Sequence, residues 1–355
     1  MKILYAVAGD GKGHATRSSV ILNYLKNRHQ IILAANNDAY EFFKNQNKPV
    51  THLKGHRLVY TNNKVSLLRT FLKYLLRNNH INKYNLRKLK QLIKQHKPEV
   101  IISDFEPSSF KVAQKYKIPI ISVDNQNLIT NANYDVPYSE VMSYLYTKKV
   151  ISDFSKDADF YIISSFFEPN LKTQNSVIVP PILRPELYSL TPKKKDFVLV
   201  YQTSKTNKKL IRILRTLKNQ NFVIYGWNLE KKINNLEFRK FNERKFLEDL
   251  SECKALITNG GFTTITEALH LKKPILSLPI KNQFEQIINA LHLDRLGYGE
   301  HIKKLERKRI IDFLYNLTPY EINLQRYEPK TNYYTFQVFD YLLGIVHKRK
   351  SKKNN

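Results

Sequence analysis

The chain has 355 residues and a mass of 41.9 kDa, which is too long for one ordinary domain and suits two domains of about 150 to 200 residues each. Its 42% hydrophobic and 25% charged residues are typical of a folded globular protein and exclude wholesale disorder. Lys and Arg number 59 against 30 Asp and Glu, and the net charge of +29 favours anionic partners such as nucleic acid, acidic lipid or phosphorylated ligands.

Two further features bear on the cellular compartment. The single cysteine, Cys253, cannot form an internal disulfide or a cysteine-based zinc site, so a reducing cytoplasm is expected. No stretch approaches the ~20 uninterrupted apolar residues of a membrane-spanning helix, and the apolar opening of the chain is too short for a signal peptide. The sequence therefore predicts a cytoplasmic protein that does not cross a membrane.

Short β-branched runs alternate with longer amphipathic stretches along the chain, a pattern that predicts βα units around parallel sheets. In the first half we expect strands at 2–7, 30–34, 100–103, 118–123 and 160–164, with helices at 15–26 and 86–95. In the second half we expect strands at 197–201, 222–225, 255–258 and 274–277, with helices at 210–217, 264–271 and 283–291. The predicted fold class is α/β with two Rossmann-like lobes.

A proline-rich segment at 177–195 is expected to link the two lobes, because proline interrupts both strands and helices. This gives an N-terminal domain at 1–185 and a C-terminal domain at 196–330. Residues 331–355 are expected to form one more amphipathic helix, over 333–346, followed by a frayed basic tail.

The first predicted strand leads into a glycine-rich loop that carries Gly9, Gly11 and Gly13 and then His14. Such loops let a ligand approach the backbone and present free N–H groups to it. The glycine spacing departs from the dinucleotide fingerprint G-x-G-x-x-G, which disfavours dehydrogenase chemistry. His14 is expected at the carboxyl edge of the sheet, either in a ligand site or as an ordinary surface or capping histidine.

Asp104 follows a strand that looks buried and is therefore expected at the same sheet edge as His14. An aspartate beside a histidine orients the imidazole and stabilises its protonated form, as a general base requires. The alternative is that Asp104 only accepts hydrogen bonds from nearby turn amides.

The segment 258–269 predicts a strand, a turn at Gly260 and Gly261, and a helix N-terminus, which together can bind a diphosphate. Glu267 lies one turn into that helix, where a carboxylate can accept two hydrogen bonds from a ribose diol. The alternative is a capping box, because Thr264 and Glu267 have the required spacing.

The glycine loop with His14, together with the C-terminal motif that runs from Gly260 through Pro279 to Asn289, resembles inverting GT-B glycosyltransferases. The chain is similar to glucuronosyltransferase-like enzymes and to the bacterial N-acetylglucosaminyltransferase that forms lipid II. The resemblance implies two Rossmann-like lobes with parallel sheets that face each other across a cleft. The first lobe would bind the acceptor and the second the nucleotide sugar.

The resemblance also implies roles for individual residues. His14 would be the catalytic base and Asp104 its partner, with Gly11 and Gly13 on the acceptor side. Glu267 would hold the donor ribose. The other residues expected around the donor's diphosphate, base and sugar are Gly260, Gly261, Phe262, Thr263, Thr203, Ser204, Asn242, Glu285 and Gln286.

The implied reaction is a single displacement, in which His14 takes the proton of an acceptor hydroxyl as its oxygen attacks the anomeric carbon of a hexose-type sugar. The donor is expected to be a UDP-sugar. Its nucleotide diphosphate leaves toward the helix at Thr264, so neither a metal nor a cofactor is expected. Retaining relatives carry a glutamate eight positions before Glu267, and Asn259 in that place indicates inversion. The family's longer signature with Trp is missing, so diphosphate binding is better supported than uracil recognition.

Asp157-Ala158-Asp159 imitates a metal-binding D-x-D but precedes a strand, and we interpret it as a solvated helix end.

Residues 51–100 contain twelve Lys and Arg and one acid, Glu99. Within this block, 65–77 places apolar side chains on one helical face and basic ones on another. Such a helix can lie on an anionic membrane surface, or can pack on its lobe with an ordinary solvated face. The first possibility suits a lipid-linked or glycan acceptor at the cytoplasmic leaflet.

Three other functions stay open. A nucleotide-sugar 2-epimerase shares the two-lobed fold. A nucleic-acid-binding protein would fit the charge, but the sequence has no recognisable aromatic platform or helix-turn-helix signature, which disfavours nucleic acid as a partner. A catalytically silent sugar-nucleotide sensor would differ from an enzyme by one changed residue.

Overall fold

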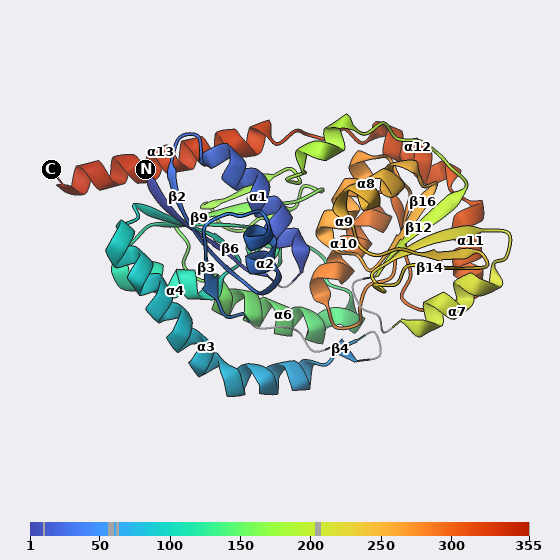
Figure 1. Ribbon diagram of the computed structural model, residues 1–355, viewed down its shortest axis with the longest axis horizontal. Coiled ribbons are helices and arrows are strands. Elements are labelled where there is room, and N and C mark those ends of the chain that lie inside the picture. The colour runs from blue at the N-terminus through green and yellow to red at the C-terminus, as the bar shows by residue number, and fades with distance from the viewer. Residues whose placement is uncertain (10, 56–59, 62–63, 203–206, 355) are drawn as a thin grey trace. The chain divides into compact units, whose positions relative to one another are not determined.

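The computed structural model describes residues 1–9, 11–55, 60–61, 64–202 and 207–354. The chain forms two compact units, each built on its own sheet (Figure 1). The first unit comprises residues 1–58, 67–184 and 330–355, and the second comprises residues 59–66 and 185–329. Two Rossmann-like α/β units agree with the predicted fold class.

The sheet of the first unit is parallel throughout. Its strands are β1 (Lys2–Val7), β2 (Gln30–Asn36), β3 (Val50–Leu53), β6 (Val100–Asp104), β7 (Ile120–Asp124), β9 (Phe160–Ser164) and β11 (Ser176–Val179). They lie in the order β11-β9-β7-β6-β1-β2-β3. β6 and β7 are buried along their whole length, and β1 is buried after its first residue, because helices cover both faces of the sheet.

Two groups of helices cover this sheet (Figure 1). Helices α1 (Lys12–Leu25), α2 (Asn37–Asn45) and α13 (Tyr333–Asn354) share one core with the strands, to which α13 contributes Phe339, Leu342, Leu343 and Val346. The last segment of the chain therefore completes the first unit. The other face of the sheet is covered by helices α3 (Leu67–His96), α4 (Pro107–Tyr116) and α6 (Val141–Phe154). The smaller elements of this unit are α5 (Leu128–Asn131), η1 (Tyr138–Glu140), β8 (Ala132–Asn133) and β10 (Asn170–Leu171).

The second unit repeats this plan. Its main strands are β12 (Phe197–Tyr201), β13 (Asn221–Tyr225), β14 (Lys231–Ile233), β15 (Leu236–Phe238), β16 (Ala255–Thr258), β17 (Ile275–Ser277) and β18 (Gly299–His301). They lie in the order β14-β15-β13-β12-β16-β17-β18, parallel except where β14 meets β15.

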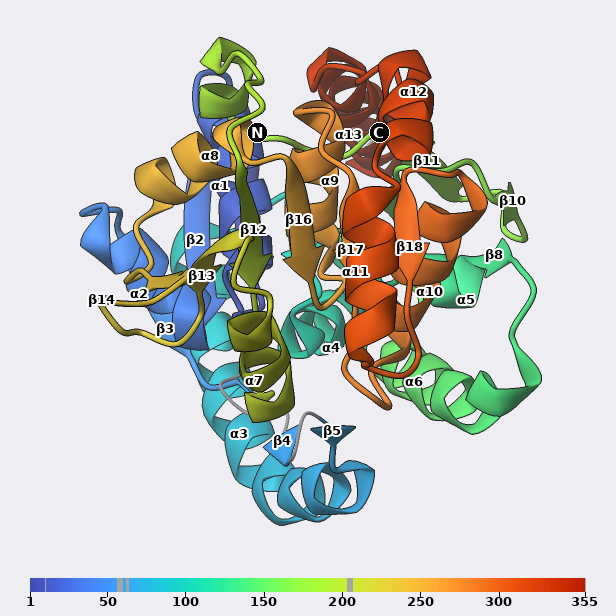
Figure 2. The ribbon, with the colours of Figure 1, turned by 90° about the vertical axis from the view of Figure 1, so that its right-hand side faces the viewer.

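Helices α7 (Lys208–Thr216) and α11 (Arg307–Tyr315) pack on one face of this second sheet, in front of the strands in Figure 2. Helices α8 (Glu243–Glu252), α9 (Phe262–His270) and α10 (Phe284–Arg295) lie on the other face. The remaining pieces are η2 (Pro185–Ser189) and α12 (Thr318–Arg326). Across all described residues, none of the helices has both the length and the hydropathy needed to cross a membrane.

A short hairpin from the first half of the sequence belongs to the second unit. It consists of β4 (Tyr60–Thr61) and β5 (Lys64–Val65). The backbone N–H of Val65 donates to the carbonyl of Lys281 at 3.0 Å, and the side-chain amide of Asn282 donates to the carbonyl of Val65 at 3.1 Å. The hairpin therefore packs beside the loop that leads into α10.

The structure corrects the sequence-based prediction at three places. The expected linker was wrong at its start, because Val177, Ile178 and Val179 form β11 beside β9 and the prolines only end that strand. The helix expected at 86–95 is the last third of α3, which runs over 30 residues. The tail at 348–353 continues α13 because Lys and Arg are good helix formers and their charge suits a helix C-terminus.

Candidate functional site

The carboxyl edge of the first sheet holds the predicted pair His14 and Asp104. β1 and β6 are neighbours in register, with Val7 beside Asp104. The chain leaves β1 through the glycine loop, and α1 begins after Gly11, whose φ of 93° favours glycine. His14 therefore lies in the first turn of α1, directly above the end of β6.

The two side chains are in contact and buried. Nδ1 of His14 lies 2.6 Å from Oδ1 of Asp104; His14 is 8% exposed and Asp104 is fully buried. A carboxylate on Nδ1 leaves Nε2 as the ring nitrogen that can accept a proton. The pair thus has the geometry of an oriented general base.

Arg17 is the member of this cluster that sequence analysis missed. Its Nε donates to Oδ2 of Asp104 at 3.1 Å, and its Nη2 donates to Oδ1 at 2.6 Å. Burial opposes ionisation of Asp104, but Arg17 and then His14 outweigh it and lower the carboxyl pKa to about 2. The available signal was the spacing, since residues three apart share one helix face.

The loop after β7 closes the surroundings of His14. The side-chain amide nitrogen of Gln126 lies 3.4 Å from Nε2 of His14, and Oδ1 of Asn125 accepts from Nη1 of Arg17 at 2.9 Å. On the other side, the ring of Phe105 stacks near the imidazole, with centroids 6.2 Å apart. The amide of Gln126 therefore lies beside the nitrogen that can accept a proton.

Two further buried carboxyls at this edge serve the local backbone. Glu106 caps α4 by accepting from the N–H of Ser109 at 2.7 Å, and Asp124 accepts from the N–H of Asn127 at 2.7 Å. Burial raises the pKa of both carboxyls. Neither side chain is paired with His14.

The carboxyl edge of the second sheet carries the predicted diphosphate motif on α9. Gly260 has a φ of 93°, and a Cβ there would lie 2.9 Å from the carbonyl oxygen of Gln286. Gly261 is the N-cap of α9, and a Cβ there would meet nothing within 4 Å. The N-terminus of α9, where free N–H groups can bind an anion, is therefore not crowded beside Gly261.

The capping-box alternative is wrong. The N-cap is Gly261, no side chain caps the helix, and Thr264 already lies inside it. Glu267 is 2% exposed and lies on the second turn of the helix. Its place at the motif thus does not come from capping.

Amide side chains hold the motif in shape. Asn289 donates to the carbonyl of Gly260 at 3.1 Å, and Oε1 of Gln286 accepts from the N–H of Ile280 at 3.0 Å. Asn259 donates to Oε1 of Gln202 and to the carbonyl of Leu278, at 3.1 and 3.2 Å. Glu285 lies in the first turn of α10, directly after the loop that the contact between Gln286 and Ile280 holds in place.

The other predicted donor residues fall at several places. Phe262 and Thr263 form the first turn of α9. Asn242 is the N-cap of α8 and accepts from the N–H of Lys245 at 3.0 Å, next to Phe241, which contacts Tyr201 at the end of β12. Thr203 and Ser204 lie outside the described residues.

The Asp157-Ala158-Asp159 sequence lies away from the histidine. It precedes β9, at the amino edge of the first sheet, whereas His14 lies at the carboxyl edge. Asp159 accepts from the N–H of Ile120 at 2.8 Å, and the Asp157 side chain is 62% exposed. Within the described ranges, no group of three or more His, Cys, Asp or Glu side chains is arranged to hold a metal ion.

Known proteins share this architecture. The model of glycosyl transferase family 1 matches residues 1–318. A glycosyltransferase of Methanosarcina acetivorans is 23% identical, covering 88% of this chain and 86% of that protein. A UDP-N-acetylglucosamine–N-acetylmuramyl-(pentapeptide) pyrophosphoryl-undecaprenol N-acetylglucosamine transferase of Bacillus thuringiensis is 23% identical, covering 69% and 71%. The solved structure of CalG4, the calicheamicin glycosyltransferase, is 15% identical with a TM-score of 0.66 and covers 97% of this chain and 98% of its own, which confirms the predicted GT-B fold.

Proposed function

The chain belongs to glycosyl transferase family 1, and from this premise we propose that it moves a hexose-type sugar from a UDP-sugar to an acceptor hydroxyl, with inversion and without a metal. The observation that carries the proposal is the buried contact of 2.6 Å between His14 and Asp104 at the carboxyl edge of the first sheet. Family membership makes the chain a glycosyltransferase, and this pair supplies the base that an inverting transfer needs.

On the acceptor side, Nε2 of His14 takes the proton of the acceptor hydroxyl while its oxygen attacks the anomeric carbon. The bond from that carbon to the diphosphate breaks in the same step, and the nucleotide diphosphate leaves with the electron pair. Asp104 stays ionised beside the imidazolium that forms. Gly11 and Gly13 keep side chains out of the approach to the base.

On the donor side, the open amides at the start of α9 and the helix dipole stabilise the negative charge of the leaving diphosphate. Glu267 accepts hydrogen bonds from the ribose, and Glu285 with Gln286 faces the sugar hydroxyls. Asn259 stands where a retaining enzyme would carry its glutamate, and its amide is used in two structural hydrogen bonds. These features support inversion and a leaving group held without a metal.

For the acceptor we propose a lipid-linked molecule or glycan, reached from the cytoplasmic face of a membrane. Helix α3 carries eight Lys and Arg and no Asp or Glu. Lys83, Arg87, Lys90 and Lys94 are exposed and follow one helical face, and Leu76, seven residues before Lys83 on that face, is 83% exposed. We call these four basic residues the α3 ridge. A basic ridge with an exposed leucine suits an anionic lipid surface.

Calorimetry with a panel of nucleotide sugars tests the donor site. We expect one UDP-sugar to bind, and Glu267→Gln to weaken it at least about tenfold, because a hydrogen bond to a charged group contributes about 1.5 to 3 kcal/mol. Glu306→Gln, at an exposed residue before α11, is the matched control. Equal affinity in the Glu267 variant would remove this donor site from the proposal.

Product analysis tests the reaction. We expect a glycoside of inverted anomeric configuration, undiminished transfer in EDTA, and loss of transfer in His14→Gln. A retained configuration, a metal requirement or an epimerised sugar formed without acceptor would contradict the proposal, and the last result would identify a 2-epimerase.

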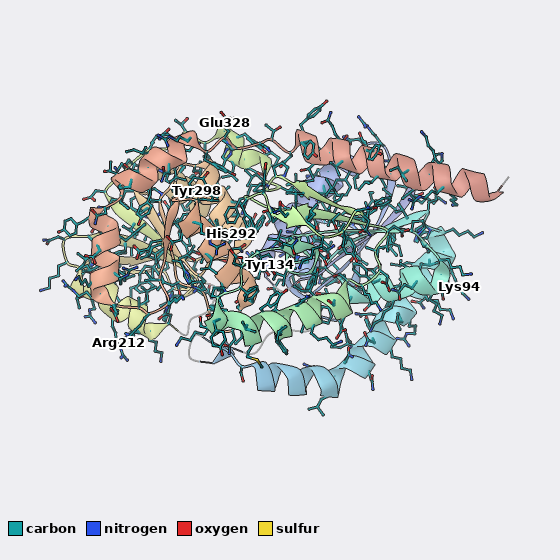
Figure 3. The ribbon with its side chains drawn as sticks, turned by 180° about the vertical axis from the view of Figure 1, so that it is seen from behind. Lys94, Tyr134, Arg212, His292, Tyr298 and Glu328 are labelled. Carbon is teal, nitrogen blue, oxygen red and sulfur yellow. The ribbon has the colours of Figure 1, made fainter. Side chains whose placement is uncertain are left out.

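Co-sedimentation with vesicles of phosphatidylglycerol tests the membrane surface at low salt. Replacing the α3 ridge by glutamine is expected to abolish binding. The matched control replaces four exposed basic residues of α7, namely Lys208, Lys209, Arg212 and Arg215; Figure 3 labels Lys94 and Arg212, one from each set. Equal losses in the two variants would show a nonspecific charge effect and exclude a dedicated surface.

A further inference from the structure

We propose that Arg17 is a positioning residue for the base, which neutralises Asp104 and so keeps the imidazole of His14 unprotonated until the acceptor's proton arrives. The inference deepens the proposed function and rests on His14 as its base. It assigns a role to a side chain that the transfer chemistry does not itself require.

Arg17 is buried and held at each of its nitrogens. The residue is 5% exposed, and a buried charge is costly unless it is paired and hydrogen-bonded. Nε and Nη2 donate to the two oxygens of Asp104, and Nη1 donates to Oδ1 of Asn125 at 2.9 Å. A planar guanidinium can make all these contacts at once, whereas a lysine ammonium cannot reproduce their geometry.

The charge of Asp104 is consequently shared between two partners. Its Oδ1 accepts from both His14 and Arg17, each at 2.6 Å, and its Oδ2 accepts from Arg17 and from the hydroxyl of Ser18, the latter at 2.8 Å. Nη2 of Arg17 also lies 3.1 Å from Nδ1 of His14. A fixed cation this close opposes a positive charge on the ring, while Asp104 favours it. Removing Arg17 would leave only the second effect.

The other groups around His14, Arg17 and Asp104 do not replace Arg17. Gln126 at Nε2 and Phe105 beside the ring are uncharged side chains. Tyr5, on β1, is fully buried, and its burial raises the hydroxyl pKa, so it stays neutral. Asp124 on β7 interacts with Arg17, and its own pKa is raised by burial. Arg17 is therefore the cation that balances Asp104 among the described neighbours of His14.

Arg17 also joins the base to the loop that borders it. Its hydrogen bond to Asn125 connects α1 with the residue before Gln126, whose amide lies 3.4 Å from Nε2 of His14. Orientation of the imidazole and placement of Gln126 thus depend on one guanidinium.

Nitrogen-15 NMR of the histidine rings tests the charge effect without any substrate. The chain has ten histidines, and His14→Gln identifies the His14 signals by their loss. We expect the pH at which His14 is half protonated to rise in Arg17→Gln, which keeps hydrogen-bonding capacity but loses the charge. It should stay near the wild-type value in Arg17→Lys, which keeps a charge, and in the exposed control Arg212→Gln.

Equal behaviour of Arg17→Gln and Arg17→Lys, or no rise in Arg17→Gln, would overturn the proposal, provided that amide spectra show folded protein. If Arg17→Gln does not fold, Asn125→Ala supplies the second variant. It leaves Asp104 paired, so the half-protonation pH should hold while the amide signals of 124–127 move, and a shift of the His14 titration there would contradict a charge-based role. A failed donor or transfer experiment would leave these ring titrations unaffected, so the two proposals fail separately.

Discussion

The carboxyl edges of the two sheets carry very different chemistry. In the first unit the edge is a cluster of buried ionisable side chains, with His14, Arg17 and Asp104 in mutual contact. In the second unit the motif consists of two glycines and backbone amides, braced by Asn and Gln side chains. A site that moves a proton needs titratable groups with defined partners, while a site that holds an anion needs exposed amides and space. The proposed function assigns proton transfer to the first edge and anion binding to the second, in each unit at the loops that follow the strands.

The contrast predicts that removing one charge harms the first edge most. Asp104→Asn leaves the buried guanidinium of Arg17 without a counter-charge, and breaking a buried pair in this way costs about 3 to 5 kcal/mol. Urea denaturation should show that loss in the free energy of unfolding, and transfer should fall with it. Asp153→Asn, at an exposed pair on α6, is the control. A loss under about 1 kcal/mol in Asp104→Asn would mean that the cluster is not the electrostatic unit described.

The same cluster should respond to acid. The pKa of Asp104 falls from 3.8 to about 2 in the folded protein, so its stabilisation is present above pH 4 and is lost as the pH drops toward 2. The depression corresponds to roughly 2 kcal/mol. We therefore expect the free energy of unfolding of the wild type to fall by about that much more than that of Asp104→Asn over this range. Parallel curves for the two proteins would contradict the lowered pKa.

Sequence reasoning located both edges because the strands that lead to them stand out as short β-branched runs. β1, β9, β12 and β16 begin and end where the β-branched runs do, and parallel strands bring His14 and Asp104 to one edge. It missed Arg17 because a polar residue in a helix gives no sign of being buried. It also could not place Gln126, since that requires the order of β7 beside β6. Prolines concealed β11, since they end that strand without disrupting it.

The second edge offers a pair of adjacent glycines with opposite expectations. Gly260→Ala places an alanine at a φ of 93° and brings its Cβ to 2.9 Å from the carbonyl oxygen of Gln286. This strain should lower the free energy of unfolding by about 1 to 3 kcal/mol. Gly261→Ala has an ordinary φ of −64° and open space, so stability should change by under about 1 kcal/mol. Because Gly261 is the N-cap of the helix that is proposed to bind the diphosphate, the added methyl group should lower UDP-sugar affinity about tenfold.

Denaturation and calorimetry on the two glycine variants separate folding from binding. Gly344→Ala, a position on α13 where a Cβ also meets nothing within 4 Å, controls for an added methyl group. If Gly261→Ala binds the donor normally, the anion is held elsewhere on this edge. The claim that the second unit binds it through the backbone amides of α9 would then be wrong.

The smallest expected effect concerns Gln126. Its replacement tests whether a side chain at the carboxyl edge of the first sheet also binds the acceptor. Its amide lies 3.4 Å from Nε2 of His14, which places it within reach of the hydroxyl that the proposed base would deprotonate. Gln126→Ala should therefore raise the acceptor KM and lower kcat/KM about fivefold, because one neutral hydrogen bond contributes about 1 kcal/mol. Donor affinity should not change, because Gln126 belongs to the first unit and the proposed donor motif to the second. If donor affinity also fell, the two edges would not be independent sites, and the division of labour between charged side chains and backbone amides would have to be abandoned.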